Sequence, residues 1–250
     1  MSSSRRAKSA LEQAFGAAAP EHFAWQTEHP YVAARERALV RAAFLPLAGR
    51  VLDLGCGEGA TLVHLGARGD ADVEAVGVDL FEDKLAFARE VLPGCRFVAA
   101  SADALPFESG SFDQVIVRDL VHHLEAPERS FAEIARVLRP GGRLDVLEPC
   151  GRNPLVLLHA LSQRAERGEL RSTPARLERL LAPGFVVTAR TRHQALPLHR
   201  IVFHPRFGLP RLAARAWAAS AVAGVEALAA RALPRALWAY MHLRATRAPG

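Results

Sequence analysis

The sequence predicts an α/β fold: a doubly wound, mostly parallel seven-stranded sheet with one late antiparallel strand, plus C-terminal helices. Three observations predict it. Short apolar runs of strand length alternate with amphipathic helical patterns, a glycine-rich loop directly follows the first run, and two later runs have the spacing of an antiparallel pair. Parallel neighbours need crossover connections, so the intervening helices would cover both faces of the sheet.

Each expected element has its own signal in the sequence. Glu82 and Asp83 place negative charge at the start of one helix, which suits the helix dipole, and Pro93 follows its end. Pro127 opens the next helix. The expected strands are residues 51–54, 73–78, 96–99, 113–117 and 144–147, followed by the late pair 185–192 and 198–203. The expected helices are residues 33–44, 82–92, 127–138, 155–167 and 172–181, with helix from 210 onward that breaks at Pro234.

The length of 250 residues suffices for one large domain with an appendage. We expect a tail and lid segment over residues 1–44, the sheet domain over 45–204 and a basic helical extension over 205–250. Charge is distributed unevenly: residues 1–150 carry 16 basic and 22 acidic side chains, whereas residues 151–250 carry 16 basic and 4 acidic ones. The C-terminal part is therefore the basic part of the chain.

Three cysteines, Cys56, Cys95 and Cys150, lie far apart and show no Cys-x-x-Cys or Cys/His spacing. The sequence therefore predicts neither a disulfide framework nor a metal site, and it favours a reducing compartment. No run of about 18 apolar residues is present, so no spanning helix is expected. The first ten residues are interpreted as a tail. These features indicate a cytoplasmic protein, with peripheral membrane contact left open.

The glycine-rich loop after the first strand fits two different cofactors. Gly55, Gly57 and Gly59 let the backbone turn sharply and approach a ligand, and the following helix offers free N–H groups. Together with Ala60, the same glycines fit the fingerprint of a dinucleotide such as NAD. Asp79, at the end of the second strand, suits a ribose in either case. The loop alone leaves both cofactors open.

Five segments in order carry a more specific resemblance. They read DLGCGEG at 53–59, GVDL at 77–80, ADALPF at 102–107, SFDQV at 111–115 and RVLRPGG at 136–142. Over residues 50–148 the chain resembles the class I S-adenosylmethionine-dependent methyltransferases of the small-molecule, Rossmann-like type. A dehydrogenase would need neither the third segment nor the acid before the first glycine, so the resemblance favours S-adenosylmethionine over NAD.

The resemblance implies a set of cofactor-binding residues. In the family, the first segment holds the methionine end, the acid of the second bonds the ribose hydroxyls, and the acid of the third bonds the adenine amino group. Carried over, the set is Asp53, Gly55, Cys56, Gly57, Gly59, Asp79, Leu80, Ala102, Asp103, Ala104 and Arg118. Cys56 is expected to pack against the cofactor. Arg118 is expected to contact either the cofactor carboxylate or an anionic acceptor, or to lie at the surface.

The segment after the fourth strand is where related enzymes bring cofactor and acceptor together. His122 and His123 are the candidate catalytic residues. A histidine with a pKa of roughly 6.5 takes up a proton near neutrality, and a positioned base contributes about 10² to 10⁴ in rate. The alternative is that the pair packs or bonds the loop. The Asn-Pro-Pro-Tyr type of sequence that grips a flipped base is missing here, which favours a small-molecule or lipid-like acceptor, anionic ones included, over nucleic acid.

Two interpretations of the C-terminal part stay open. Leu233, Leu237 and Met241 fall on one face of an expected helix and, beside arginines, would rest on an anionic membrane. Alternatively, helices over 213–230 and 233–243 pack on the core. The alternative function is a non-catalytic protein of the same fold that binds membrane or nucleic acid through this part.

Two smaller sets of residues complete the expectations. The aromatic residues Phe23, Trp25 and Tyr31 form either a lid over the cofactor or an edge of the core. Arg152, Arg164 and Arg171 are expected to line the mouth of the site and attract an acidic substrate.

Overall fold

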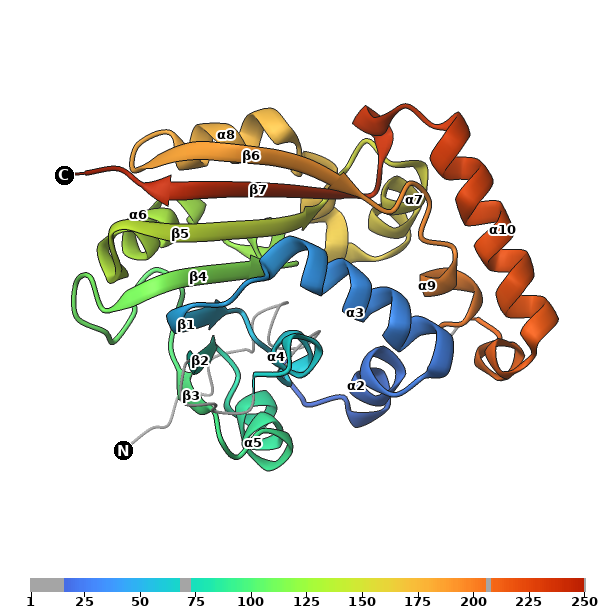
Figure 1. The fold of residues 1–250 in the computed structure, drawn as a ribbon, viewed down its shortest axis with the longest axis horizontal. Helices are drawn as coiled ribbons and strands as arrows, with labels where there is room; N and C mark the ends of the chain where they lie inside the picture. Colours follow the sequence, from blue (N-terminus) through green and yellow to red (C-terminus); the bar gives the residue numbers. More distant parts are fainter. Residues whose placement is uncertain (1–15, 68–72, 206–207, 250) are drawn as a thin grey trace, which may run out of the picture.

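A computed structural model describes residues 16–67, 73–205 and 208–249, so the expected N-terminal tail lies outside the described residues. Seven strands form one sheet in the order β3-β2-β1-β4-β5-β7-β6 (Figure 1). Their bounds are β1 Gly49–Leu54, β2 Val73–Asp79, β3 Arg96–Ala99, β4 Phe112–Arg118, β5 Leu138–Pro149, β6 Phe185–His193 and β7 Tyr240–Arg247. β7 runs antiparallel to β5 and β6, and the other pairs are parallel, which confirms the predicted fold class.

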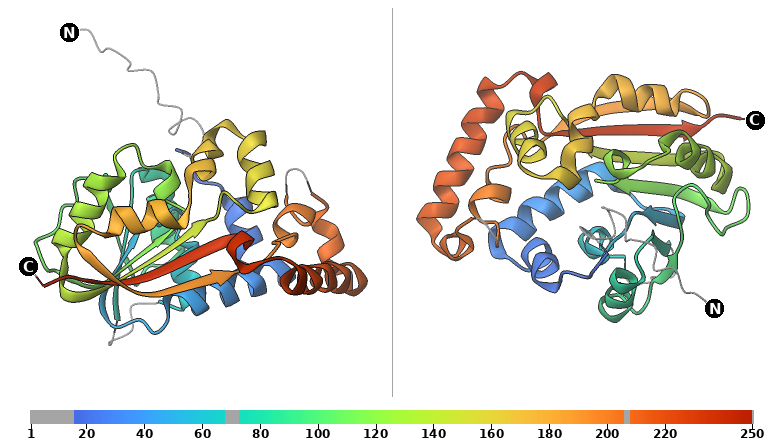
Figure 2. Two further views of the ribbon diagram at one scale, coloured as in Figure 1. Left: turned by 90° about the horizontal axis from the view of Figure 1, so that it is seen from above. Right: turned by 180° about the vertical axis from the view of Figure 1, so that it is seen from behind.

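Helices cover both faces of the sheet, as Figure 2 shows. α6 and α8 pack on one face, where Phe131, Ile134 and Leu177 join the core cluster of β4 and β5. α3 packs on the other, where Leu39 and Phe44 meet strand residues of that side. The helices are α2 Pro20–Thr27, α3 Pro30–Phe44, α4 Ala60–Leu65, α5 Glu82–Val91, α6 Pro127–Val137, α7 Pro154–Ser162, α8 Pro174–Leu181, α9 His199–Val202 and α10 Ala216–Ala232, with short 3-10 turns η1 Val121–His123, η2 Arg164–Arg171, η3 Pro210–Ala214 and η4 Arg235–Leu237.

The strand order reverses between β1 and β4. From β1 the chain proceeds outward to β2 and β3, whereas β4 lies on the other side of β1 and is followed by β5. At such a switch point the connections leave in opposite directions, so a crevice opens beyond the carboxyl ends of the two strands. The glycine loop follows β1 and the two histidines follow β4. The fold therefore brings both predicted segments to the same crevice.

Two predicted elements of the C-terminal part are wrong. Residues 198–203, expected as a strand, contain the short helix α9, and residues 233–243, expected as a helix, contain η4 and the start of β7. In β7, Met241, Leu243 and Ala245 are buried in the main core on one face of the sheet, and Tyr240 is buried in the cluster on the other face. The i, i+4 spacing of Leu233, Leu237 and Met241 suggested one helix, but Leu233 follows the end of α10, Leu237 lies in η4 and only Met241 belongs to β7.

The segment 205–250 is therefore not purely a helical extension. It contributes α10, which lies beside the end of the sheet, and then returns to supply β7 between β5 and β6 (Figures 1 and 2). None of the helices in the described ranges has the length and apolar character that crossing a bilayer requires.

Candidate active site

A cavity of about 720 Å³ opens at the carboxyl ends of β1, β2 and β4. This volume lies in the range typical of small-molecule sites. Of the predicted site residues, those that line it are Gly55, Cys56, Gly57, Asp79, Leu80, Ala102, Arg118, His122 and His123. Asp53, Gly59, Asp103 and Ala104 are not among its lining residues. The structure thus gathers nine of the thirteen predicted residues around one space.

The glycine loop has a backbone that other residues would rarely adopt. Gly55, Gly57 and Gly59 have φ angles of +78°, +52° and +86°. A Cβ added at Gly55 would lie 2.9 Å from the side chain of Leu120, so this glycine is also needed for packing. At Gly57, by contrast, the nearest atom to an added Cβ is Lys84 Nζ at 4.0 Å. The backbone at Gly57 is therefore directly accessible from the cavity.

Asp79 ties the end of β2 to this loop. Its Oδ2 accepts a hydrogen bond of 2.9 Å from the Gly57 N–H, and its Oδ1 accepts one of 3.0 Å from the Phe81 N–H. The carboxylate is thereby fixed at the wall of the cavity. Asp103, in contrast, is exposed, and it accepts a hydrogen bond from Ser101, which lines the cavity.

Asp53 and Cys56 are buried around the loop. Asp53 is 1% exposed, and its Oδ2 has no hydrogen-bond partner among the described residues. Burial is the main cause that raises the pKa of Asp53 to about 7; the charge of Arg118 opposes the rise and that of Asp79 adds to it. Burial likewise raises the pKa of the Cys56 thiol well above its usual value. The thiolate form of Cys56 is therefore disfavoured.

Arg118 lines the cavity, but its guanidinium group is paired with carboxylates of the chain itself. Its Nη2 donates to Glu36, which is fully buried on α3, and its Nε lies 3.4 Å from Asp119 Oδ2. Arg200 of α9 grips the same Glu36 carboxylate with two hydrogen bonds, from Nε to Oε1 at 2.8 Å and from Nη2 to Oε2 at 2.6 Å. Glu36 therefore receives two guanidinium groups.

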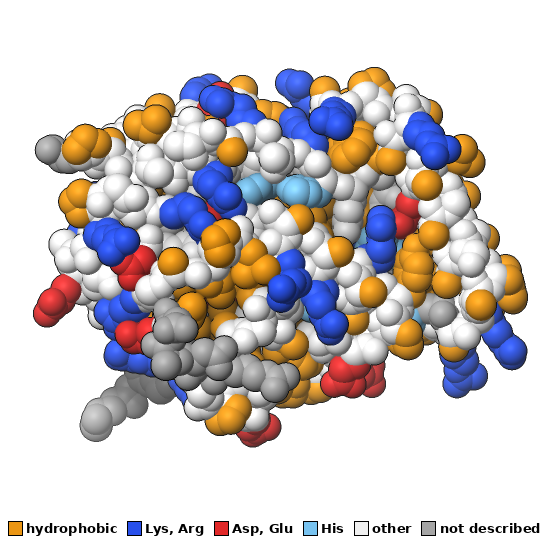
Figure 3. Space-filling model, viewed as in Figure 1, with side chains coloured by type: hydrophobic (Ala, Val, Ile, Leu, Met, Phe, Trp, Pro, Cys, Tyr) orange, Lys and Arg blue, Asp and Glu red, His pale blue; other side chains and the backbone are white. Residues whose placement is uncertain are grey.

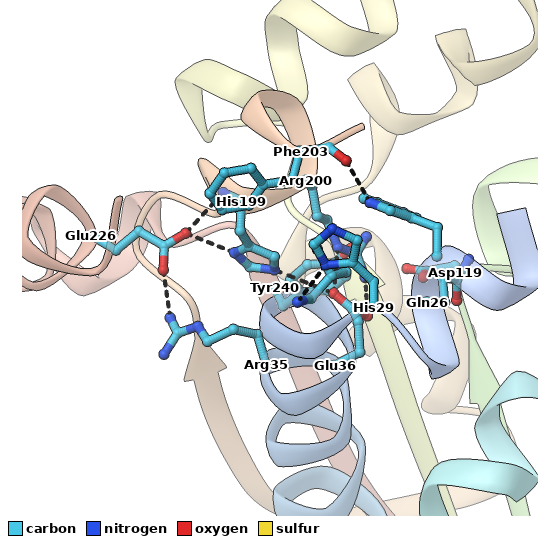
Figure 4. A network of polar contacts seen from close by, with 12 residues as sticks. Gln26, His29, Arg35, Glu36, Asp119, His199, Arg200, Phe203, Glu226 and Tyr240 are labelled. Carbon is cyan, nitrogen blue, oxygen red and sulfur yellow. Dashed lines mark hydrogen bonds and ion pairs between the residues drawn. The ribbon is translucent and has the colours of Figure 1, made fainter. Parts of the chain in front are cut away.

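This network extends to the C-terminal helix (Figure 4). His199 Nε2 lies 3.4 Å from Glu36 Oε1, and His199 Nδ1 lies 2.7 Å from Glu226 Oε1 on α10. Glu226 Oε2 in turn pairs with Arg35 of α3 at 2.9 Å. Burial alone would raise the pKa of Glu36, but the charges of Arg200 and Arg118 and the hydrogen bond with His199 hold it well below its usual value. The N-terminal helix and the C-terminal segment are thus joined by a buried charged network beside the cavity.

This network is not predicted by any pattern in the sequence. Glu36, His199, Arg200 and Glu226 lie up to 190 residues apart and form no motif. An acid in the middle of an apolar helix face was the available signal, because such an acid needs a partner when the helix packs. Phe23 and Trp25 of α2, expected either as a lid or as an edge of the core, are buried and line the cavity, and Trp25 Nε1 donates to the Phe203 carbonyl at 2.7 Å.

His122 and His123 lie on η1 with very different surroundings. The side chain of His122 is 2% exposed and lies between two carboxylates, with Nδ1 2.7 Å from Glu148 Oε2 and Nε2 3.4 Å from Glu166 Oε2. Burial would lower the pKa of His122, but the charge and hydrogen bond of Glu148 outweigh it and raise the pKa well above the usual value. Burial, followed by the charge of His122, lowers the pKa of His123 to about 4.

Further titratable side chains surround this pair. Glu166 and Glu169 of η2 and His159 of α7 line the same side of the cavity, and His159 Nδ1 lies 3.1 Å from Glu169 Oε2. None of them belonged to a predicted motif. Arg152, Arg164 and Arg171, which were expected at the mouth, are exposed and are not among the residues that line the cavity. The charged groups on this side are thus histidines and carboxylates.

Comparisons with known proteins agree with this geometry. Residues 52–146 match the family model of a methyltransferase domain. Over 116 residues, the chain is 36% identical to the demethylmenaquinone methyltransferase of Clavibacter sepedonicus, which covers 45% of this chain and 46% of that protein. The chain thus spans less than half the length of the curated relatives it matches, 41% for an uncharacterized methyltransferase of Mycobacterium tuberculosis.

Solved structures extend the likeness over most of the chain. The phosphoethanolamine N-methyltransferase 2 of Haemonchus contortus in complex with S-adenosylmethionine has a TM-score of 0.60 at 20% identity, over 86% of this chain and 52% of that one. The [4+2]-cyclase SpnF has a TM-score of 0.55 at 25% identity, over 88% of this chain and 82% of that one. The matched domain, the relatives and the shared fold agree: residues 52–146 are similar to a methyltransferase domain, and the chain has the fold of solved methyltransferase structures.

Proposed function

We propose that this chain transfers the methyl group of S-adenosylmethionine to a small-molecule or lipid-like acceptor. The observation that carries the proposal is the continuity of the cavity, which reaches from the glycine loop to the turn of His122 and His123. When bound, the cofactor supplies a methyl group on a positively charged sulfur. The task of the chain's own residues is alignment, which supplies on the order of 7 to 11 kcal/mol of a transfer barrier.

The cofactor half of the cavity fits this ligand. The open backbone at Gly57 and the first turn of α4 suit the methionine end, and the fixed carboxylate of Asp79 suits the ribose. Ala102 and Leu80 would flank the adenine, with Asp103 and Ala104 at the rim. Asp53 and Gly59 would act from behind, by holding the loop. We assign these roles on the family resemblance and the placement of each residue.

The other half of the cavity would receive the acceptor. We propose that His122 and His123 act there, because they are titratable side chains on the β4 side of the space. Apolar side chains such as Trp25, Val156 and Ile201 line the cavity and would exclude water around the acceptor. Such walls suit an acceptor with an apolar body and a few polar groups.

The acceptor need not be anionic. The guanidinium groups of Arg118 and Arg200 are already paired with Glu36, and the three arginines expected at the mouth do not line the cavity. The relatives' names point to small molecules, demethylmenaquinone in one case and phosphoethanolamine in another. These observations support a small or lipid-like acceptor over nucleic acid.

Calorimetric titration with S-adenosylhomocysteine tests the cofactor half. Asp79→Ala should weaken binding about 10- to 150-fold, because a hydrogen bond to a charged group contributes about 1.5 to 3 kcal/mol. Asp83→Ala is the matched control, since Asp83 is an exposed acid nearby on α5. NAD is titrated in parallel. Binding of NAD, or no binding of S-adenosylhomocysteine by the wild-type chain, would refute the proposal.

Methyl transfer itself is then measured with methyl-labelled S-adenosylmethionine and a panel of hydroxyl and amine acceptors. His122→Ala and His123→Ala should each lower turnover at least about tenfold, because a positioned acid or base contributes about 10² to 10⁴ in rate. The affinity of both variants for S-adenosylhomocysteine should stay the same. Unchanged turnover in both variants would remove the histidines from the catalytic role. The fold also occurs in a [4+2]-cyclase, so transfer of the label, and not cofactor binding alone, decides the reaction.

A second proposal concerns peripheral contact with a membrane, for a protein that stays in the cytoplasm. On α10, Trp217, Val225 and Leu228 share a face and are 66%, 48% and 64% exposed. Figure 3 shows blue Lys and Arg side chains beside orange hydrophobic ones along the region of α10. An apolar face flanked by arginines suits an anionic lipid surface. All three cysteines are free, which agrees with a reducing compartment.

A further inference from the structure

His122, His123 and Glu166 bring three metal-binding atoms together at the acceptor side of the cavity. One ligand atom from each lies within 4.8 Å of the others. Glu166 Oε2 is 3.4 Å from His122 Nε2 and 3.7 Å from His123 Nε2. Two ligands of a tetrahedral ion at about 2.0 to 2.1 Å are roughly 3.3 to 3.4 Å apart, so these distances are close to the edges of a coordination tetrahedron. We propose that the three side chains bind a divalent transition-metal ion.

The orientation of His122 supports a ligand role. Glu148 Oε2 lies 2.7 Å from His122 Nδ1, and Glu148 Oε1 accepts hydrogen bonds from the backbone N–H groups of Leu120 and Val121 at 2.6 and 2.7 Å. This carboxylate is thus fixed at the end of β5 and directs Nε2 of His122 toward Glu166. Histidine ligands in metalloproteins are oriented in the same way, with the second ring nitrogen bonded to a carboxylate.

Close packing holds Glu166 in place. η2 lies directly against the η1 turn, because a Cβ added at Gly168 would be 1.9 Å from the carbonyl oxygen of His122. Any other residue at 168 would push η2, and Glu166 with it, away from the two histidines. The ligands from two separate parts of the chain are therefore held by backbone contact rather than by the side chains alone.

The ligand types select the class of ion. Two imidazoles and one carboxylate suit Zn²⁺, Fe²⁺ or Mn²⁺, whereas Mg²⁺ and Ca²⁺ prefer sites built from oxygen. All three ligands line the cavity, so a coordination position would face the acceptor. His159, Glu166 and Glu169 form a second group of possible ligands that shares Glu166.

The inference rests on the proposed function and deepens it. An ion at this place would favour an acceptor that presents an oxygen or nitrogen to a Lewis acid, and it would fix that group on the β4 side of the cavity. A ring nitrogen of His123 that binds the ion cannot at the same time take up a proton from the acceptor. The histidine pair would then serve by holding the ion.

The test is calorimetric titration of the untagged, chelator-treated full chain with zinc chloride, and with magnesium chloride in parallel. Zinc should bind with one equivalent per chain and magnesium should not. Glu148→Gln should weaken zinc binding about 10- to 100-fold, and His123→Ala and Glu166→Gln should weaken it by more than about 100-fold. His193→Ala is the matched control, because His193 lies on β6 and is not among the cavity-lining residues.

Titration of each variant with S-adenosylhomocysteine reports whether the chain is folded. No zinc binding by the wild-type chain, or binding that persists in both His123→Ala and Glu166→Gln, overturns the metal site. Failure of the wild-type chain to bind S-adenosylhomocysteine would instead refute the proposed function, and the zinc titration would still decide the metal site on its own.

Discussion

Glu36 offers a sharp test of the buried network. The Glu36 carboxylate is fully buried and accepts hydrogen bonds from the guanidinium groups of both Arg200 and Arg118. It thereby neutralises part of their positive charge. Glu36→Gln keeps the size but removes the charge, which leaves two cations beside the cavity without their common partner. Removing one partner of a buried ion pair costs about 3 to 5 kcal/mol. For a chain of this length that corresponds to a fall in Tm of about 6 to 20 °C.

Urea denaturation monitored by circular dichroism measures this loss. Glu74→Gln is the matched control, because Glu74 is 60% exposed and pairs with Arg50 at the surface, where a pair contributes about 0 to 1 kcal/mol. Arg200→Gln in the Glu36→Gln background should recover part of the stability, because it removes one of the unpaired charges. Equal midpoints for Glu36→Gln and Glu74→Gln, or no recovery in the double variant, would contradict the reasoning.

Three further predictions concern separate parts of the molecule. Gly168→Ala should weaken zinc binding but keep S-adenosylhomocysteine affinity, since it moves η2; Gly224→Ala, where an added Cβ meets no atom within 4 Å, should change neither titration. Burial, more than any other cause, lowers the pKa of His64 to about 4. The unfolded chain therefore binds more protons below pH 6.5, and stability should fall as pH drops from about 6.5 to 4, with a smaller fall in His64→Gln; equal pH profiles in urea denaturation would exclude this cause. Replacing Trp217 and Leu228 by Ser should reduce pelleting with anionic liposomes, and equal pelleting would remove the membrane proposal.

The cofactor half of the site could be predicted from the sequence because its residues lie in short motifs that are local in the chain. The loop of Gly55 and Gly57 and the acid at Asp79 lie at strand ends, where an apolar run gives way to glycine or an acid. Parallel neighbours put these strand ends at one edge of the sheet, so the order of segments along the chain was enough to predict that they meet.

The acceptor half could not be predicted in the same way. Glu148 and Glu166 each look like an ordinary acid, and only the folding of η2 against η1 brings Glu166 to the histidines. The absence of metal-ligand spacing in the sequence excluded only sites made of neighbouring residues. The last strand could not be predicted for another reason. Leu233, Leu237 and Met241 have a helical spacing, but only Met241 belongs to β7, and β7 is formed by pairing with β5 and β6, which are far away in sequence.

The position of β7 has a consequence for synthesis of the protein. β6 lies at the edge of the sheet and pairs with β7, which follows it by about 50 residues. One edge of β5 also pairs with β7, so neither partner is complete until β7 has been made. At the usual 5 to 20 residues per second, a ribosome needs roughly 3 to 10 s to make that stretch. During this interval the hydrogen-bonding edges of β5 and β6 are unsatisfied on a nascent chain, so this is the period in which chaperone capture or mispairing with another chain would compete with correct folding.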